Sequence, residues 1–348
     1  MFREKSHRTY ALSLLFLAVV SGCAGKKPKE DYGPEVMGPV ITDHKVDEEA
    51  VPPEAYGPVA QGPVTPPPAA EPAPTATITN TATNTTVSTD SPRLCIVLGP
   101  GMAKAMAEAA VLESIRRAKL PVHCVVGTEM GAIVGALYAH SNGSTNNLQW
   151  QLFKFNKNNY FNFPMLSLHD PKSTGQRLNE FLRGLFKEAH IESLPIKFAT
   201  TAVDDDTDSS VELDKGALAD ALSASAAVPG IFDSWKIGES SFRSAAVADP
   251  APMELARKLG GNFIVLVDVL IEGAAGTKSR FHRAFTSARS LMKLQKKDAS
   301  FVIEVNTSTI AFDDFARKGE ILAAGAASME KALPELKAAW ERWSAGPR

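Results

Sequence analysis

The sequence predicts an α/β domain of three layers, α/β/α, with a mainly parallel central sheet. Short continuous apolar runs, typical of strands buried on both faces, occur at 94–98, 122–126 and 263–269. Segments with helical character follow the three runs. Strands that alternate with helices favour a parallel sheet covered on both sides. A chain of 348 residues is long enough for one such domain and extensions.

The remaining elements follow the same alternation. The expected helices are 103–118, 130–139, one that Asp249 caps and Gly260 ends, and a tail that reaches Trp343. Further strands are expected at 198–203, 210–213 and 301–305. The turn Asp204–Asp208 carries four carboxylates, for which a solvated turn and a calcium site are both open.

The N-terminus has the features of a secretory signal. Basic residues precede an apolar run, 10–20, that is shorter than a membrane-spanning helix. Ser21 and Gly22 stand directly before Cys23, and small residues before a cysteine resemble the cleavage box of bacterial lipoproteins. We therefore expect a signal peptide at 1–22 and a lipidated, palmitate-bearing Cys23, anchored in the outer membrane and facing the periplasm.

Residues 23–92 differ in composition from the rest of the chain. Proline, threonine and alanine dominate, and no apolar periodicity is present. Such a segment cannot bury enough apolar surface to offset its ordering entropy. We expect a disordered tether that ends at 92, followed by the folded domain at 93–340.

Charge and cysteine content exclude some classes of function. The net charge of −2 and the absence of a long basic stripe argue against nucleic acid as a partner. A basic stretch at 278–297 is expected to be a solvated helix face, with anionic headgroups as the alternative. Cys95 and Cys124 fall in predicted buried strands, where we expect free thiols rather than a disulfide. We expect no cofactor and no metal.

The segment Gly127-Thr128-Glu129-Met130-Gly131 has the form of a nucleophile elbow. Glycines on both sides permit a tight turn from strand to helix, which lifts the middle side chain above the sheet. In hydrolases that side chain is a serine, and here it is Glu129.

The sequence resembles the patatin-like phospholipase family over roughly 92–336. The resemblance rests on the run 125–139 around the elbow, on 224–232, on 252–260 and on 311–315. It implies the α/β/α fold and, in the family, hydrolysis of lipid acyl esters by a Ser-Asp dyad. It also implies an oxyanion hole formed by a glycine-rich loop.

Each of these catalytic parts differs here. The nucleophile position is Glu129, and the position of the dyad aspartate is Ser244. The oxyanion loop reads Pro100-Gly101-Met102; Pro100 has no N–H, and Met102 adds a side chain where substrate should approach. The resemblance therefore implies a pseudoenzyme that binds a lipid, an acyl ligand or an envelope protein. The alternative is an active acyl hydrolase that uses Glu129 as a base.

Two positions are possible for the Glu129 side chain. Its carboxylate could occupy the anion position permanently, held by N–H groups at the start of the next helix and by Lys104, with a depressed pKa. Alternatively, it points into solvent. A cleft left open above Glu129 would favour ligand binding, whereas a cleft filled by Met102 and Met106 would favour protein contact. Ser223 and Ser225 are expected to pack or to bond the backbone.

Overall fold

The computed structural model describes residues 91–145, 148–163, 171–271, 273 and 279–346. The chain divides into two units, 1–80 and 81–348, and all described residues belong to the second. The predicted signal peptide, Cys23 and nearly all of the predicted tether therefore lie outside the described residues. The structure leaves those predictions untested.

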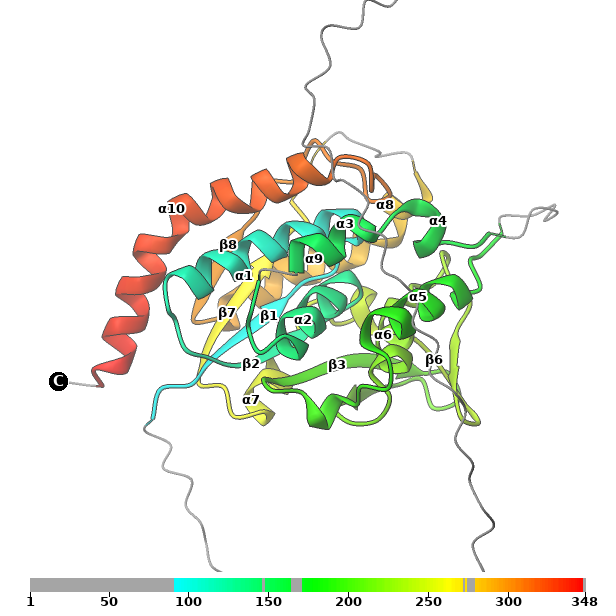
Figure 1. Ribbon diagram of the computed structural model, residues 1–348, viewed down its shortest axis with the longest axis horizontal. Helices are drawn as coiled ribbons and strands as arrows, with labels where there is room; N and C mark the ends of the chain where they lie inside the picture. Colours follow the sequence, from blue (N-terminus) through cyan, green and yellow to red (C-terminus); the bar gives the residue numbers. More distant parts are fainter. Residues whose placement is uncertain (1–90, 146–147, 164–170, 272, 274–278, 347–348) are drawn as a thin grey trace, which may run out of the picture. The chain divides into compact units, whose positions relative to one another are not determined.

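The second unit is built on a mixed sheet with the strand order β5-β6-β3-β2-β1-β7-β8, and β4 pairs with β3 (Figure 1). Pairings β3–β2, β2–β1, β1–β7 and β7–β8 are parallel, and the hairpin strands β4, β5 and β6 are antiparallel. The strands are β1 Leu94–Leu98, β2 Val122–Gly127, β3 Lys197–Asp204, β4 Ser209–Leu213, β5 Trp235–Ile237, β6 Ser240–Ser244, β7 Phe263–Asp268 and β8 Phe301–Glu304.

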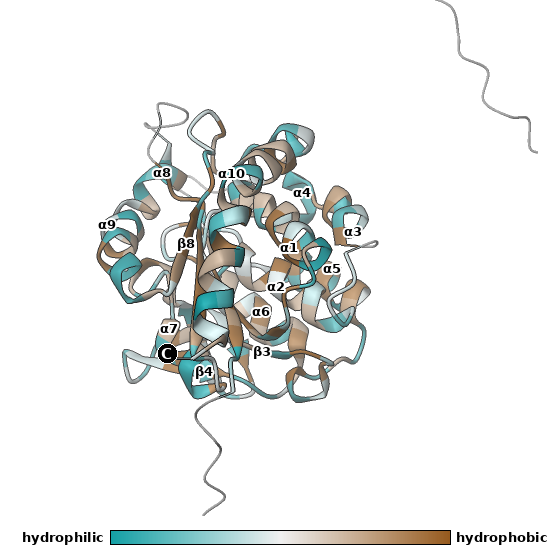
Figure 2. Ribbon diagram, turned by 90° about the vertical axis from the view of Figure 1, so that its left-hand side faces the viewer, coloured by the Kyte–Doolittle hydropathy of each residue, from teal (hydrophilic) through white to brown (hydrophobic). Residues whose placement is uncertain are grey.

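Helices cover both faces of the sheet. The 3₁₀ turns are η1 Met102–Ala107, η2 Ile191–Ser193, η3 Ala245–Val247 and η4 Lys296–Asp298. The α-helices are α1 Glu108–Arg117, α2 Met130–His140, α3 Leu148–Lys154, α4 Lys157–Tyr160, α5 Gln176–Phe186, α6 Leu218–Ala226, α7 Met253–Lys258, α8 Arg280–Ala284, α9 Thr286–Gln295 and α10 Lys318–Ser344. Figure 2 shows α8 and α9 on one side of the sheet and α1, α2, α5, α6 and α10 on the other. The predicted α/β/α class is confirmed.

Apolar sequence explains the centre of the sheet. All five residues of β1 and all six of β7 are buried, as continuous apolar strands between two helical layers must be. Helix α2 is buried from Met130 to Ala139, so it lies inside the domain rather than on its surface. None of the described helices combines the length and the apolar character needed to cross a membrane.

The predicted cap of α7 is wrong. This helix begins at Met253, with Pro252 at its N-cap position. Asp249 instead accepts a hydrogen bond from Gln295 Nε2 (2.6 Å). Pro250 and Pro252 lack N–H groups, and a residue that precedes proline is disfavoured in α conformation, so the helix cannot begin before the second proline.

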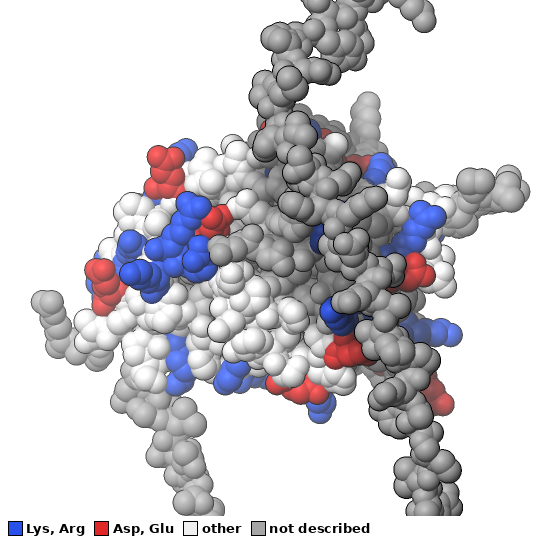
Figure 3. Space-filling model, in the orientation of Figure 1, with Lys and Arg blue, Asp and Glu red and all other residues white. Residues whose placement is uncertain are grey.

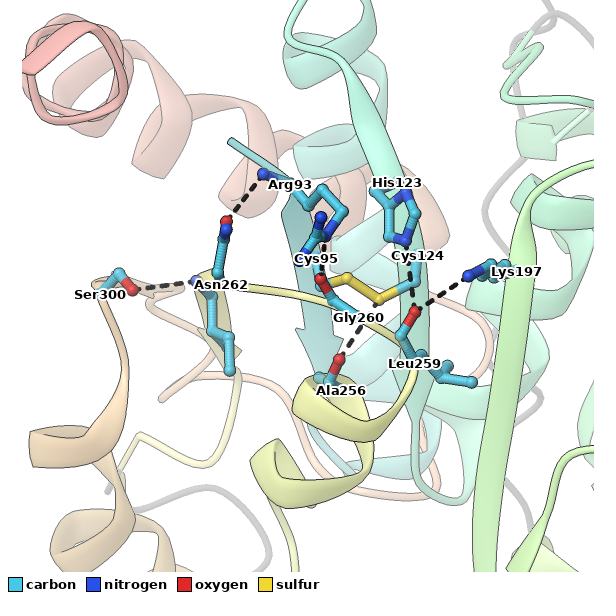
Figure 4. Close-up of a disulfide and its surroundings, with 11 residues drawn as sticks. Arg93, Cys95, His123, Cys124, Lys197, Ala256, Leu259, Gly260, Asn262 and Ser300 are labelled. Carbon is cyan, nitrogen blue, oxygen red and sulfur yellow. Dashed lines mark hydrogen bonds between the residues drawn. A yellow bond between two sulfur atoms is a disulfide. The ribbon is translucent and has the colours of Figure 1, made fainter. Parts of the chain in front are cut away.

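The prediction of two free thiols is also wrong, because Cys95 and Cys124 form a disulfide (Figure 4). The two residues are directly paired in the parallel strands β1 and β2, with Cα atoms 4.6 Å apart. That spacing lies within the range that a disulfide can bridge. The separation of 29 residues gives no information about register, which is why the sequence alone did not reveal the bond.

Candidate functional site

The turn between β2 and α2 has the geometry of a nucleophile elbow. Glu129 lies at φ 56° and ψ −124°, a backbone region that non-glycine residues rarely adopt. A Cβ at Gly127 would lie 2.6 Å from the Ala132 backbone, and one at Gly131 would lie 2.8 Å from the Leu98 carbonyl oxygen. Both glycines are therefore required for the strand and the helix to approach this closely.

Hydroxyl groups hold the backbone of the elbow. The Glu129 N–H donates to Ser225 Oγ (3.1 Å), which lies 2.7 Å from Thr200 Oγ1. Thr128 Oγ1 donates to the Pro250 carbonyl (3.1 Å). Ser225 is thus a support for the elbow, and Ser223 bonds the Ala219 carbonyl (2.9 Å). Backbone bonding was the role expected for both serines.

The side chain of Glu129 is fully buried, with no exposed surface, so the solvent-exposed alternative is wrong. Its Oε2 accepts hydrogen bonds from the Gly101 N–H (2.9 Å) and the Met102 N–H (2.8 Å). These two amides belong to the loop after β1. The expected Met130 N–H at the start of α2 also acts on the carboxyl, but the loop supplies the two donors to Oε2.

This finding corrects our interpretation of the loop Pro100-Gly101-Met102. The missing N–H of Pro100 and the added side chain of Met102 suggested that no anion pocket remains. Instead, the Gly101 and Met102 amides converge on one oxygen, in the arrangement of an oxyanion hole. The loop still forms the pocket, and the chain's own carboxylate occupies it.

Tyr160 is the functional residue that sequence reasoning missed. It ends the short helix α4, is fully buried, and its hydroxyl donates to Glu129 Oε1. Burial and the neighbouring Glu129 raise the pKa of the Tyr160 phenol well above its usual value, so it stays a donor. Four aromatic residues between 155 and 163 were the available signal for a segment that packs inward.

Aromatic rings close the space above Glu129. The Tyr160 ring centroid lies 4.9 Å from that of Phe161, 4.9 Å from Phe315 and 5.7 Å from Phe232. Phe281, on α8, packs on Phe161 at 5.4 Å. Met102 and Met106 are buried too, but the rings that surround Tyr160 come from elsewhere in the chain. Aromatic rings thus pack around Tyr160 on the side of the site where Glu129 is covered.

Burial determines the ionisation of Glu129. It raises the pKa of the Glu129 carboxyl, and the hydrogen bonds from Tyr160, Met130, Gly101 and Met102 oppose this increase without cancelling it. The expectation of a depressed pKa is therefore wrong. The sequence could not show that the carboxyl would be buried. Removal from water raises the Glu129 pKa by more than the four hydrogen bonds lower it.

A second buried carboxyl, Glu108, lies near the elbow. Burial is the main cause that raises its pKa well above the usual value, and Glu129 and Asp268 raise it further. Neither Glu108 oxygen has a hydrogen-bond partner in suitable geometry. The nearby Gly99 N–H lowers the pKa of Glu108 but does not cancel the increase. Its own hydrogen bond goes to the Val267 carbonyl (3.2 Å). Burial thus disfavours the charged form of Glu108.

Lys104 does not contact Glu129, which corrects the expected pairing. Its Nζ lies 4.7 Å from the centroid of the Phe312 ring. Burial and the nearby Arg289 lower the pKa of Lys104 to about 8. The side chain is thus held by a cation–π contact away from the carboxylate.

Ser244 stands at the end of β6, where it pairs with Ala202 of β3. Its Oγ accepts from the Ala246 N–H (3.2 Å), so it caps a 3₁₀ turn. A serine in this position supplies neither a carboxylate nor a base. In the acidic turn, Asp204 bonds the turn's own amides, and Asp205 pairs with Arg243 (2.8 Å).

Among the described residues, the site thus combines two oxyanion donors with a glutamate at the nucleophile position and a serine at the position of the dyad aspartate. A carboxylate that accepts bonds on both oxygens cannot easily attack an ester, and the product would be an anhydride. The nearest hydroxyl, that of Tyr160, keeps its proton because its pKa is raised. The Glu129 carboxyl thus occupies the oxyanion position itself.

Comparison with known proteins gives consistent matches. The family model described as "Patatin-like phospholipase" matches residues 96–259. An uncharacterised NTE family protein of Mycobacterium tuberculosis is 26% identical over 196 residues, which cover 55% of this chain and 52% of the relative. The chain thus spans about half the length of that relative.

Two further matches are more distant. Patatin-like phospholipase domain-containing protein 6 of Mus musculus is 26% identical over 51% of this chain and 13% of its own length. The crystal structure of VipD from Legionella pneumophila covers 70% of this chain and 67% of that chain, with 9% identity and a TM-score of 0.46.

Proposed function

Because the chain carries a domain of the patatin-like phospholipase family, we propose that it is a catalytically inactive member of that family, held in the bacterial envelope by a lipid anchor. One observation carries the proposal: Glu129 stands at the nucleophile position and occupies the oxyanion donors Gly101 and Met102 itself. An ester carbonyl would have to displace a buried carboxylate to reach them.

Magnitudes favour inactivity over a rearranged hydrolase. Loss of an activated serine costs on the order of 10⁶ in rate in serine hydrolases. Ser244 in place of the dyad aspartate leaves no base, and the rings around Tyr160 fill the space that an acyl chain would need. The filled cleft also makes an acyl ligand in the old site less favourable than contacts made by the outer surface.

The disulfide supports an envelope location. Structural disulfides persist in the periplasm and outside the cell and are rare in the cytosol. The Cys95–Cys124 bond therefore agrees with export by the predicted signal peptide and with lipidation of Cys23. The small residues before Cys23 support the outer-membrane anchorage that we propose, with the domain facing the periplasm.

Hydrolysis of p-nitrophenyl butyrate and palmitate tests the inactivity. The full chain should release p-nitrophenol no faster than buffer, and Glu129→Gln should be indistinguishable from it. Turnover in the wild type that disappears in Glu129→Gln would establish the active hydrolase instead.

Mass spectrometry of protein extracted from the envelope tests the anchor. We expect acyl chains on Cys23 of the mature protein and none after Cys23→Ser. A mature chain without acyl groups would refute the lipoprotein part of the proposal and leave the inactivity untouched.

A further inference from the structure

We propose that the face formed by α3, α4 and the segment 311–318 docks on a phospholipid bilayer, with a zwitterionic headgroup seated in a pocket between α4 and that segment. This inference goes beyond the inactive site and stands whether or not the domain hydrolyses esters. It rests on a mixed-charge pocket and on exposed aromatic side chains beside it.

The pocket has a volume of about 640 Å³. Its polar lining is Asn156, Lys157, Asn158, Asp313, Asp314 and Lys318. Lysines and aspartates in one pocket match the phosphate and the ammonium of a zwitterionic headgroup, such as phosphoethanolamine. The two asparagines add neutral donors and acceptors.

The ion pair within the pocket can be replaced by ion pairs with a bound ligand. Lys157 Nζ pairs with Asp313 Oδ2 at 2.7 Å, and the lysine side chain is 58% exposed. An exposed pair of this kind contributes little to stability, so opening it costs little. A bound headgroup would place its phosphate on Lys157 and Lys318 and its ammonium on Asp313 and Asp314.

Two large aromatic side chains stand exposed beside the pocket. Trp150 is 65% exposed and Phe153 is 48% exposed, and both belong to α3. Residues three apart lie on the same side of a helix. Lys318 Nζ donates to the Phe153 carbonyl (2.6 Å) and lies 5.9 Å from the Phe153 ring centroid, which joins α3 to the pocket. Figures 1 and 2 both show α3 and α4 beside the start of α10.

A bilayer surface fits this combination of groups. Tryptophan and phenylalanine next to lysine are typical of helices that lie in the interface, where rings enter the acyl boundary and ammonium groups stay with phosphates. Lys154 is also exposed on α3. A protein interface would be expected to bury the aromatic pair without a mixed-charge pocket for a headgroup. Figure 3, in the orientation of Figure 1, shows another group of Lys and Arg side chains over α1 and α10, on the opposite side of the view from α4.

The pocket also leads toward the closed site. Phe315 lines the pocket, and its ring packs on Tyr160 at 4.9 Å. Tyr160 in turn bonds Glu129. The rings block the path inward, so a headgroup bound here would remain at the surface with its acyl chains in the bilayer.

Vesicle binding by the full chain tests the proposal. All variants carry Cys23→Ser, so that no attached lipid contributes and the leader is common to all. The probe is vesicles of phosphatidylethanolamine mixed with phosphatidylglycerol. Trp150→Ala/Phe153→Ala should lower the partition coefficient about tenfold or more. Leu294→Ala, which removes an equally exposed side chain (65%) from α9, should leave it unchanged.

Two further arms identify the contact. Trp150→Phe should bind normally but lose most of the fluorescence quenching by brominated acyl chains. Asp313→Asn/Asp314→Asn should remove any preference for phosphatidylethanolamine over vesicles of phosphatidylglycerol alone. Circular dichroism checks that each variant is folded.

Three results would overturn the proposal. One is equal partitioning of Trp150→Ala/Phe153→Ala and its parent. The second is an unchanged phosphatidylethanolamine preference in Asp313→Asn/Asp314→Asn. The third is binding of soluble O-phosphoethanolamine by a parent protein that does not bind vesicles, which would make the pocket a site for a free solute.

Discussion

The Tyr160 hydroxyl donates a hydrogen bond to Oε1 of Glu129, and both side chains are fully buried. Together with the two loop amides on Oε2, this bond satisfies both oxygens of a carboxyl at the position of a hydrolytic nucleophile. The Glu129 carboxyl therefore has a hydrogen-bond donor on each of its two oxygens.

Tyr160→Phe should destabilise the fold. The substitution removes the donor to Oε1 and leaves a buried acceptor without a partner, which costs about 1–3 kcal/mol. Urea denaturation at neutral pH measures the change. In the background Glu129→Ala the same substitution should cost much less, because the acceptor is gone, and an equal cost in both backgrounds would refute the bond.

Glu129→Gln should alter how stability depends on pH. The pKa of Glu129 is raised by burial, so its contribution to stability is fully present below the pKa of the unfolded chain and is lost as pH rises through the folded pKa. Glutamine keeps the hydrogen-bonding shape without ionising. The unfolding free energy of the variant, relative to wild type, should therefore increase as pH rises from about 4 to about 8, because the wild type loses about 1.4 kcal/mol for each pH unit between its unfolded and folded pKa. A decrease over that range would show a depressed pKa.

Glu108→Met should stabilise the domain. Glu108 is a buried carboxyl without a hydrogen-bond partner, and replacing it by an apolar side chain of similar volume removes a desolvation penalty of about 1–3 kcal/mol. Because the pKa of Glu108 is raised in the fold, the wild type loses stability as pH rises, whereas methionine does not ionise. The stability gain of Glu108→Met should therefore increase with pH. Differential scanning calorimetry measures it, with the exposed Glu330→Met as control. A loss of stability would mean that Glu108 has a partner.

The sequence predicted much of the fold but only part of the site. Continuous apolar runs located β1, β2 and β7, and the glycines at 127 and 131 located the elbow. Tyr160 could not be assigned, because it reaches Glu129 from a helix 31 residues away whose own pattern is polar. The Glu129 pKa is raised because the side chain is buried, and the sequence of the elbow does not show whether this side chain is buried or exposed.

The Cys95–Cys124 bond should be present in protein recovered from the envelope. Its intact mass should be lower than that of the reduced chain by the mass of two hydrogen atoms. Cys95→Ala/Cys124→Ala should lower the unfolding free energy by roughly 3–4 kcal/mol, from the chain-entropy cost of closing a loop of this length. Urea denaturation with and without reductant measures this difference. Free thiols in the untreated protein would contradict the structure.

Hydrogen exchange at two amides tests most directly whether the oxyanion donors are occupied. Gly101 and Met102 N–H should exchange slowly in the wild type, because both donate to a buried carboxyl oxygen. They should remain slow in Glu129→Gln, which keeps an acceptor, and become at least about tenfold faster in Glu129→Ala, where the acceptor is lost. Exchange of both amides at the same rate in wild type and Glu129→Ala would contradict the self-occupied site.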